Sequence, residues 1–228
     1  ASGDISVQSN DVVLCTYTNT RKQGQIELKK AWVGTGGQTT LNIGTSLGGS
    51  EKGSQLTGAA GTAPLTTGPK TVDTGTYHVS ESGGLTDYDQ SLECKAGSTV
   101  LTVGAGNSVA VGQNQNVVCT YTNTRKQGTI KLVKKLENGG SDKFQLKIDG
   151  VAQTVSPGGG TAFGNDDATA IQLKGTGTYT NNESAIAPAN GADYDQSQSC
   201  VNNGTGTPVT SGTVTIAKGD NWVCTFTN

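Results

Sequence analysis

The sequence predicts an all-β fold that consists of two β-sandwich domains in tandem. Three observations lead to this prediction: a long internal repeat, short runs in which apolar and polar residues alternate, and clusters of Gly and Asn between those runs. No window has a convincing helical period. Many short strands separated by turn signals are typical of a β-sandwich.

The internal repeat sets the domain organisation. The segment CTYTNTRKQG occurs at 15–24 and again at 119–128, and a shorter copy, CTFTN, occupies 224–228. Two further matches, YxxxE and DYDQS, recur at the same relative places in both repeats. We therefore expect domains at 21–124 and 125–228, joined by a short link over 124–128. Residues 1–20 match the end of each repeat, so we interpret them as the last strands of a preceding repeat.

Alternation predicts the first and last strands of each repeat. In the first strand, Ile26, Leu28 and Lys30 fall on one face, and the second repeat has the same pattern from Ile130 to Lys134. In the last strand, Cys119, Tyr121 and Asn123 share a face. The runs end in turn-forming stretches, which are found at 34–37, 158–160 and 202–204.

Composition excludes several function classes. Apolar residues make up 32% of the chain, so each core is expected to be small and to need covalent staples. Lys and Arg (16) nearly balance Asp and Glu (18), which leaves no basic surface for nucleic acid. No apolar run is long enough to insert into a membrane.

The five cysteines predict one disulfide in each repeat and an oxidising, extracellular location. Each repeat has one Cys before the last strand and one within it, so we predict the pairs Cys94–Cys119 and Cys200–Cys224. In the chain-entropy model, loops of this size stabilise a domain by roughly 3 kcal/mol. Cys15 is then unpaired, and its partner is expected upstream of Ala1.

Other chemistry finds little support in the sequence. Zinc sites need closely spaced Cys or His, whereas the chain has one His and no Cys-x-x-Cys. His78 is the only possible base for a Cys nucleophile and lies inside a strand pattern. The run Asn165-Asp166-Asp167 offers only three oxygen ligands for Ca²⁺. We expect no metal, no cofactor and no turnover of outside substrates.

Both repeats carry three elements in a fixed order: a Lys that ends Gly-x-Ile-x-Leu-x-Lys, the Glu of Tyr-x-x-x-Glu, and an Asn in the last strand. This pattern resembles the Cna B-type and SpaA-like domains of bacterial surface adhesins and pilins. The resemblance implies tandem immunoglobulin-like β-sandwiches in a linear array. It also implies a single-turnover reaction in which the Lys amine attacks the Asn amide, assisted by the Glu, to form an isopeptide bond. The implied residues are Lys30, Glu81 and Asn123 in repeat one, and Lys134, Glu183 and Asn228 in repeat two.

These residue types suit that chemistry. A Lys is nucleophilic only when neutral, and burial among apolar neighbours lowers its pKa. A buried Glu is pushed towards its protonated form, which can polarise an amide and transfer a proton. Simpler roles remain open at this point. Lys30 could point outward on a solvated edge, both glutamates could be surface charges, and Asn123 could be a turn residue.

Two functions of different classes follow. The first is a structural repeat of a bacterial stalk, pilus or filament at the cell surface, whose partners are neighbouring repeats and other copies in a fibre. The second is an adhesin module that binds a host protein or glycan through variable loops at about 35–70 and 137–175. The identical junction segments favour the first, and the lack of an aromatic cluster argues against the second.

Overall fold

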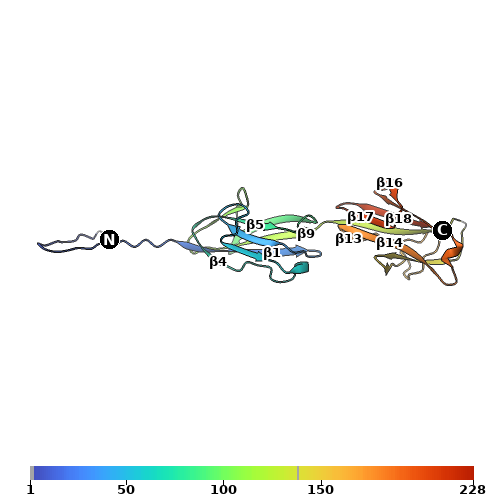
Figure 1. The fold of residues 1–228 in the computed structure, drawn as a ribbon, viewed down its shortest axis with the longest axis horizontal. Coiled ribbons are helices and arrows are strands. Elements are labelled where there is room, and N and C mark those ends of the chain that lie inside the picture. Colours follow the sequence, from blue (N-terminus) through green and yellow to red (C-terminus); the bar gives the residue numbers. More distant parts are fainter. Residues whose placement is uncertain (1–2, 138) are drawn as a thin grey trace.

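The computed structural model describes residues 3–137 and 139–228. From Gln23 on, the chain forms two β-sandwiches that follow one another along the long axis of the molecule (Figure 1). Each sandwich consists of two packed sheets. The architecture predicted from the repeat and from the alternation is confirmed. The helical turns, Ala59–Gly61 and Gly191–Asp193, are short and lie in loops. No helix in the described ranges has the length and apolarity needed to cross a membrane.

The first sandwich is built from strands β1 to β9. One sheet has the order β4-β1-β9-β6-β7 and the other the order β3-β2-β5-β8. The strands are β1 (Gln23–Val33), β2 (Thr40–Gly44), β3 (Gly53–Leu56), β4 (Lys70–Asp73), β5 (Gly75–Ser82), β6 (Tyr88–Ala96), β7 (Thr99–Leu101), β8 (Ser108–Val111) and β9 (Asn116–Arg125).

The second sandwich repeats this plan with strands β10 to β18. Its sheets have the orders β13-β10-β18-β15-β16 and β12-β11-β14-β17. The strands are β10 (Gln127–Lys135), β11 (Lys143–Ile148), β12 (Val151–Ala152), β13 (Gln172–Gly175), β14 (Gly177–Ile186), β15 (Ser197–Asn202), β16 (Thr205–Val209), β17 (Thr213–Ile216) and β18 (Asn221–Thr227).

The first and last strands of each sandwich are parallel neighbours in the middle of one sheet. Strand β1 pairs with β9 from Gln25↔Asn116 to Val33↔Thr124, and β10 pairs with β18 in the same way. Parallel pairing is possible because the whole sandwich forms the connection between the two strands. The chain therefore enters and leaves each domain through strands that lie side by side.

The core follows the alternation of the sequence. Strand β1 alternates between exposed and buried positions, and its buried side chains include Ile26, Leu28 and Lys30. Strand β9 buries Val117, Cys119, Tyr121 and Asn123. Each sandwich has its own cluster of buried apolar side chains. The two domains therefore have separate cores.

The repeated glycine of TRKQG is required by close backbone packing. A Cβ atom on Gly24 would lie 2.4 Å from the carbonyl oxygen of Gly112, and one on Gly128 would lie 2.7 Å from that of Ala217. Such distances are far below van der Waals contact, so a side chain would push β1 or β10 away from the neighbouring turn. This glycine lets the first strand of each sandwich lie against the turn that precedes the last strand.

Two disulfides join neighbouring strands, one in each sandwich. Cys94 of β6 is bonded to Cys119 of β9, and Cys200 of β15 to Cys224 of β18. In both cases the two cysteines are directly opposite each other in the antiparallel ladder. These are the pairs that the cysteine spacing predicts. The last strand has two neighbours in its sheet, and each disulfide links it to the antiparallel one, β6 or β15, and not to the first strand.

The expected link over 124–128 is in fact strand. Strand β9 continues to Arg125 and β10 begins at Gln127, so that only Lys126 lies between them. The expectation of a separate linker was wrong because Arg125 pairs with Tyr88 and Gln127 with Gly175, which extends both sheets to Lys126. The expected domain limits 21–124 and 125–228 differ from these strand ends by one or two residues.

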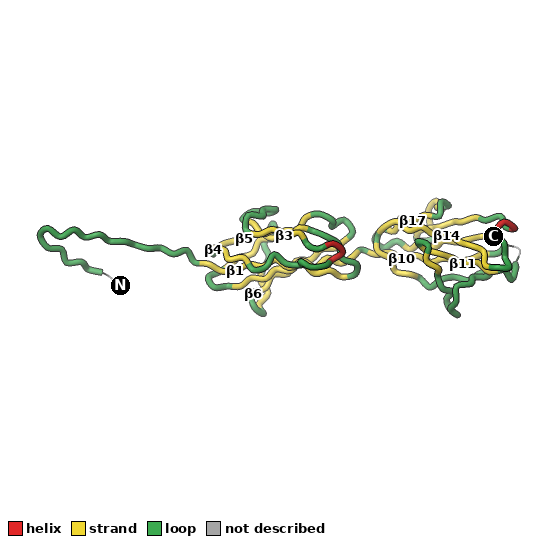
Figure 2. Tube along the Cα trace, turned by 60° about the horizontal axis from the view of Figure 1, so that its bottom comes forward, coloured by secondary structure: helices red, strands yellow, loops and turns green. Residues whose placement is uncertain are grey.

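Residues 3–22 contain no helix or strand (Figure 2). Several apolar side chains there are almost fully exposed, such as Val12 (98%) and Tyr17 (91%), and Cys15 is exposed and free. Their interpretation as the last strands of a preceding repeat stays a prediction. It accounts for apolar residues in strand-like alternation that have no sheet to pack on here.

Candidate functional site

The first candidate cluster surrounds Lys30, which extends from β1 into the core of the first sandwich. Its side chain is fully buried, with an exposed fraction of 0%. The Nζ atom lies 3.1 Å from Oε2 of Glu81 and donates a hydrogen bond of 3.3 Å to the carbonyl oxygen of Tyr121. The same Nζ lies 4.4 Å from the centre of the Trp32 ring. A buried cation therefore has one charged, one polar and one aromatic partner.

Glu81 reaches this cluster from the opposite sheet. It belongs to β5, which pairs with β2 and β8, whereas Lys30 belongs to the sheet of β1 and β9. The Glu81 side chain is only 2% exposed. The ion pair therefore crosses the interior between the two sheets. A buried ion pair is expensive to desolvate, which makes it a weak source of stability and a reason to look for another role.

Asn123 lies beside this ion pair on β9. Lys30 is the register partner of Tyr121, and Asn123 follows two residues later on the same face of the same strand. Asn123 is completely buried, and neither its amide nitrogen nor its amide oxygen has a hydrogen-bond partner. Leaving such groups unpaired in a core costs about 1–3 kcal/mol each.

The second sandwich has an equivalent cluster. The buried Lys134 of β10 places Nζ 3.2 Å from Oε2 of Glu183, which comes from β14 of the opposite sheet. Its Nζ also donates to the carbonyl oxygens of Lys135 and Phe226, at 3.2 Å each. The ring of Phe144 lies 4.5 Å from Nζ and takes the place that Trp32 has in the first sandwich.

Asn228 occupies the place of Asn123. Lys134 is the register partner of Phe226, and Asn228 follows two residues later. Its amide atoms are buried and make no hydrogen bond of good geometry, although the side chain is near enough to Glu183 to lower the pKa of that carboxyl. Its backbone is held, because Asn228 N donates to Lys135 O at 3.1 Å and Asn228 O accepts from Glu137 N at 3.0 Å. Asn228 is therefore fixed against β10 although it lies beyond the end of β18.

Burial shifts the pKa values of Lys30, Lys134 and Glu183 towards their neutral forms. Burial lowers the pKa of Lys30, and the opposing effect of Glu81 is smaller. Burial also lowers the pKa of Lys134, against the effect of Glu183. The pKa of Glu183 is raised, again mainly by burial, although Lys134 and the nearby side chain of Asn228 lower it. In the second sandwich, burial thus favours transfer of a proton from Lys134 to Glu183.

This arrangement has the parts needed for acyl transfer from an amide to an amine. A neutral Lys is the nucleophile, the carboxamide of Asn is the electrophile, and a protonated Glu is the acid that can polarise the amide. Fixed geometry matters most, because an amide is a poor electrophile. The structure pairs Lys30 with Glu81 and Lys134 with Glu183, and the strand register places Asn123 and Asn228 two residues beyond the partner of each Lys. We call Lys30–Glu81–Asn123 and Lys134–Glu183–Asn228 the two triads.

The simpler roles considered for these residues do not fit the structure. Lys29, not Lys30, is the exposed member of its pair, and Glu81 is buried instead of lying on the surface. Asn123 is inside β9 and is not a turn residue. Sequence reasoning missed the aromatic rings of Trp32 and Phe144 over the amines. Trp32 shares the strand face of Lys30 at a spacing of two, which is a usable signal, but Phe144 comes from another strand.

Other candidates have ordinary structural roles. His78 is a strand residue of β5, and its Nδ1 contacts the carbonyl oxygen of Gly106 at 2.8 Å. Asn165 accepts a hydrogen bond from Leu136 N, just beyond the end of β10, and Asp167 accepts one from Gly164 N within its own loop. Within residues 3–137 and 139–228, no group of three His, Cys, Asp or Glu residues is placed to hold a metal ion.

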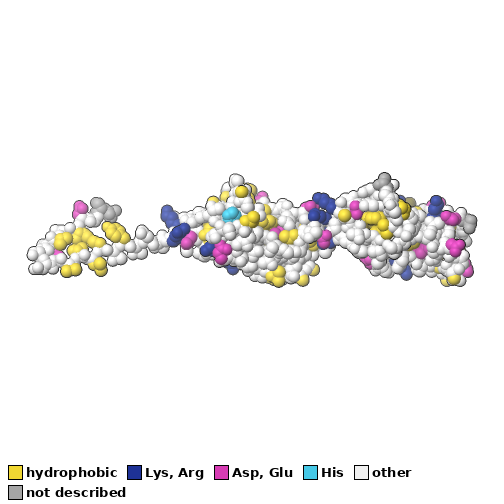
Figure 3. Space-filling model, turned by 45° about the horizontal axis from the view of Figure 1, so that its top comes forward, with side chains coloured by type: hydrophobic (Ala, Val, Ile, Leu, Met, Phe, Trp, Pro, Cys, Tyr) yellow, Lys and Arg dark blue, Asp and Glu magenta, His cyan; other side chains and the backbone are white. Residues whose placement is uncertain are grey.

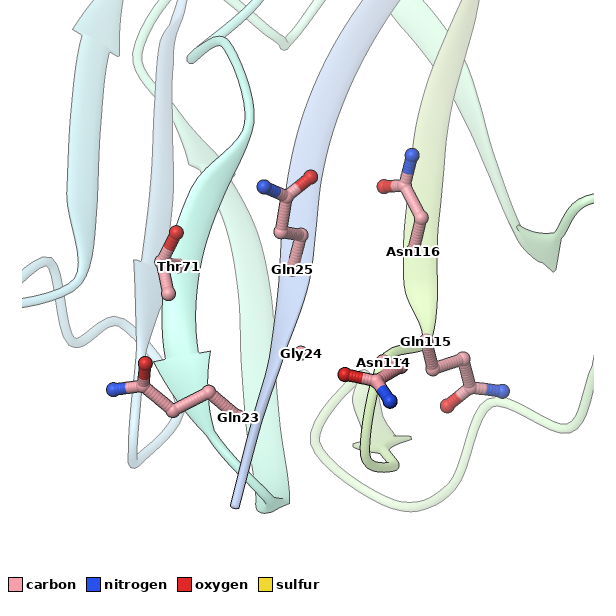
Figure 4. A pocket seen from close by; sticks show the side chains of 7 residues that line it. All are labelled: Gln23, Gly24, Gln25, Thr71, Asn114, Gln115 and Asn116. Atoms are coloured by element: carbon pink, nitrogen blue, oxygen red, sulfur yellow. The ribbon is translucent and has the colours of Figure 1, made fainter. Parts of the chain in front are cut away.

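An open cleft of about 340 Å³ lies at the end of the first sandwich where β1 begins (Figure 4). Amide side chains dominate its lining, which consists of Gln23, Gly24, Gln25, Thr71, Asn114, Gln115 and Asn116. It contains no charged or aromatic group, and its residues lie outside the loops 35–70 and 137–175. It therefore gives no support to ligand binding through those loops.

A family profile described as a prealbumin-like fold domain matches residues 25–125 and again residues 129–228. The chain is similar to the major pilin protein T3.2 of Streptococcus pyogenes, with 14% identity, a TM-score of 0.50, and coverage of 91% of this chain and 97% of that one. For the major pilin protein T-13 of the same species, the identity is 16%, the TM-score 0.49, and the coverage 92% and 98%. Among curated proteins, none is a significant match. At these identities, the structural likeness establishes the fold alone.

Proposed function

Because this chain belongs to the family of prealbumin-like fold domains, we propose that its sandwiches are structural repeats of a bacterial extracellular pilus, stalk or filament. We further propose that each repeat is stapled by a self-generated Lys–Asn isopeptide bond in addition to its disulfide. The similar structures are named as major pilin proteins, which supports a location at the cell surface. Disulfides form and persist in the same kind of oxidising environment.

One observation carries the proposal: the same costly arrangement is buried twice. Each sandwich places an ion pair in its core next to an Asn amide without hydrogen-bond partners. Structural stability does not explain this, since an apolar replacement of the pair would serve as well or better. Formation of a covalent bond does explain it, because the reaction consumes both the buried charge and the unpaired amide.

The reaction balances without any outside reagent. The proton of the Lys ammonium passes to the Glu carboxylate, which leaves a neutral amine. Nζ then attacks Cγ of the Asn, and the protonated Glu stabilises the charge that develops on the amide oxygen. The C–N bond to the Asn nitrogen breaks, and this nitrogen takes one proton from Glu and leaves as ammonia. The proton that Nζ loses on forming the new amide returns to Glu, which therefore ends in the neutral, protonated form. One new amide bond forms for each amide bond that is broken.

The position of this bond suits a load-bearing repeat. Lys30 belongs to the first strand and Asn123 to the last, and these strands are parallel neighbours. A covalent bond between them would carry tension from the entry of the chain to its exit without pulling on the strands between. Such a bond raises kinetic stability, because forced unfolding depends on the barrier and not on the equilibrium.

Intact mass tests the proposal directly. We expect the reduced chain to be lighter than its sequence mass by two ammonia molecules, one for each triad. Glu81→Gln should restore one ammonia and Glu183→Gln the other, because each amide loses its proton donor while the side-chain volume is kept. Glu27→Gln is the matched control. Glu27 lies on the outer face of β1, where it pairs with Lys29 at 3.5 Å, so its substitution should leave the mass deficit unchanged.

A reduced chain with its full sequence mass would refute the crosslinks and leave the disulfides as the only staples. Fragment masses identify the bond when a deficit is found. A branched peptide that joins the Lys30 segment to the Asn123 segment is the expected product in the first repeat. Ammonia lost elsewhere, for example by deamidation-type cyclisation of an exposed Asn, would produce no branched peptide and would also contradict the proposal.

A further inference from the structure

The two sandwiches meet through direct polar contacts. Asp87, in the turn that leads into β6, lies against Thr176, which separates β13 from β14 in the second sandwich. The hydroxyl group of Thr176 donates to Asp87 Oδ1 at 2.8 Å, and Lys126 N donates to Asp87 O at 2.9 Å. Asp87 thus accepts hydrogen bonds both from Lys126, which lies between the two domains, and from Thr176 of the second domain.

Arg125 completes the contact between the domains. Its Nη1 lies 3.3 Å from Asp87 Oδ2, and its Nη2 donates to the carbonyl oxygen of Thr176 at 2.5 Å. The guanidinium group lies 5.2 Å from the centre of the Tyr88 ring. One arginine at the end of β9 therefore bridges the two domains through charge-assisted hydrogen bonds and a stacked ring. Arg125, Asp87, Tyr88 and Thr176 are called the junction clamp below.

Arg125 and Thr176 of the junction clamp have counterparts at the start of the first sandwich. Residues 20–24 have the same sequence as 124–128, so Arg21 and Lys22 correspond to Arg125 and Lys126. Thr74 corresponds to Thr176, and Thr74 N donates to Lys22 O at 2.9 Å, as Thr176 N does to Lys126 O at 3.0 Å. The first sandwich therefore already has the surface that could contact a preceding domain, and its Arg21 is exposed.

Asp87 and Tyr88 of the junction clamp have counterparts at the far end of the second sandwich. Asp193 and Tyr194 correspond to Asp87 and Tyr88 within the repeated DYDQS segment. The two turns share one hydrogen bond, because Tyr194 N donates to Gly191 O as Tyr88 N does to Leu85 O, although Tyr88 begins β6 and Tyr194 lies before β15. Asp193 is exposed. In Figure 3, basic side chains mark the start of the first sandwich and the junction, whereas acidic side chains gather at the far end of the second.

We propose that the end face carrying Asp193 and Tyr194 docks onto the end face carrying Arg21, Lys22 and Thr74 of another copy of this chain. The partner is thus a sandwich of the same repeat type, held in the geometry of the junction clamp. This inference rests on the proposed function and adds to it the surface through which repeats are stacked. A head-to-tail interface of this kind does not close on itself, so it propagates a filament.

Two differences make this contact weaker than the observed junction. Asp73 stands in the first sandwich where the second has Gly175, and its Oδ2 lies 3.5 Å from Arg21 Nε. Arg21 must leave Asp73 in order to reach Asp193. The second difference is peripheral: Lys218 pairs with Asp89 at 2.8 Å across the junction, and Gln113 takes the place of Lys218 in the first sandwich. The first position touches the clamp itself, because a Cβ atom at Gly175 would lie 3.1 Å from Arg125 Nε, whereas the second lies outside it.

A concatemer provides the test. The full chain is followed directly by residues 20–228 of a second copy, so that the join reads Asn-Thr-Arg-Lys-Gln-Gly, as at 123–128. Spin labels on unnatural amino acids, one in each flanking sandwich, give distance distributions across the natural and the new junction. We expect both distributions to be equally narrow. A free five-residue linker would instead spread its ends over about 12 Å.

Substitutions at the new junction identify the contacts. Asp193→Ala in the first copy, or Arg21→Ala in the second, should broaden the distance distribution across the new junction. The distributions across the natural junctions should stay narrow. Asp193→Arg combined with Arg21→Asp in the second copy should narrow the distribution across the new junction again. The inference is overturned if the distance distribution across the new junction is as broad as that of a free linker, or if these substitutions leave it unchanged. The mass deficit of the same concatemer reports the isopeptide bonds separately, so docking and crosslinking can fail independently.

Discussion

Lys134→Ala is expected to produce the largest loss of stability of any single substitution in the second repeat. It leaves the buried Glu183 carboxyl without a hydrogen-bond partner, which costs about 1–3 kcal/mol. It also removes the proposed bond to Asn228, which closes nearly the whole domain into a loop and is worth about 4–5 kcal/mol in the chain-entropy model. The sum approaches the total stability of an ordinary domain, so the second repeat should unfold near or below room temperature while the first stays folded.

Scanning calorimetry of the chain measures this as the loss or large downward shift of one of two transitions. Lys135→Ala is the matched control, because Lys135 is the next residue of β10 and is exposed; it should shift neither transition by more than about 0.5 kcal/mol. A Lys134→Ala variant with two unchanged transitions would contradict both the buried ion pair and the crosslink.

The double substitution Lys134→Met with Glu183→Leu separates the two contributions. An apolar pair of similar volume commonly replaces a buried ion pair at no loss of stability. If the pair is only an ion pair, the double variant should therefore be as stable as the natural chain. If the isopeptide bond forms, the double variant should remain less stable by the crosslink contribution, about 4–5 kcal/mol. The second result is the one expected.

Removal of one disulfide should have the second largest effect and should be confined to one domain. With Cys94→Ala and Cys119→Ala together, a loop with a sequence separation of 25 residues is opened in the unfolded state. The expected loss is about 3.5 kcal/mol for the first repeat. At about 4–8 °C per kcal/mol for a domain of this size, the Tm of that repeat should fall by roughly 15 °C or more.

The Cys200–Cys224 pair of the same molecule serves as the internal control, since the two sandwiches have separate cores. Its repeat should keep its transition temperature. A Cys15→Ala variant should change neither transition, because Cys15 is exposed and outside both sandwiches. Equal shifts of both transitions in the double cysteine variant would show that the repeats unfold as one unit, and would contradict the prediction.

Much of the fold was open to prediction because its pattern is local or repeated. Alternation places Ile26, Leu28 and Lys30 on one face of β1, since successive side chains of a strand point to opposite sides, and the structure shows that this face is buried. The spacing of the cysteines gives both disulfides, because the pattern occurs twice. The resemblance to surface-protein domains supplied the choice of Glu81 and Glu183, which alternation could not have singled out.

The link between the repeats was mispredicted for a physical reason. The polar segment Thr-Arg-Lys-Gln-Gly looks like a linker by composition, but Arg125 and Gln127 are strand ends whose backbone groups find partners in the sheets. Composition describes how side chains interact with water, whereas a strand is decided by the backbone partners that the neighbouring strands offer. Those partners are distant in sequence.

The sequence by itself determined that this protein is a chain of β-sandwich repeats with one disulfide in each, because periodicity and cysteine spacing are properties of the chain alone. Only the tertiary structure decided that Lys30 pairs with Glu81 of the opposite sheet, and that Asn123 is buried without a hydrogen-bond partner. It also decided that Asp87 accepts a hydrogen bond from Thr176 of the next domain. Each of these contacts joins residues far apart in sequence. Their distance depends on how two sheets pack and how two domains meet, and no local pattern encodes that distance.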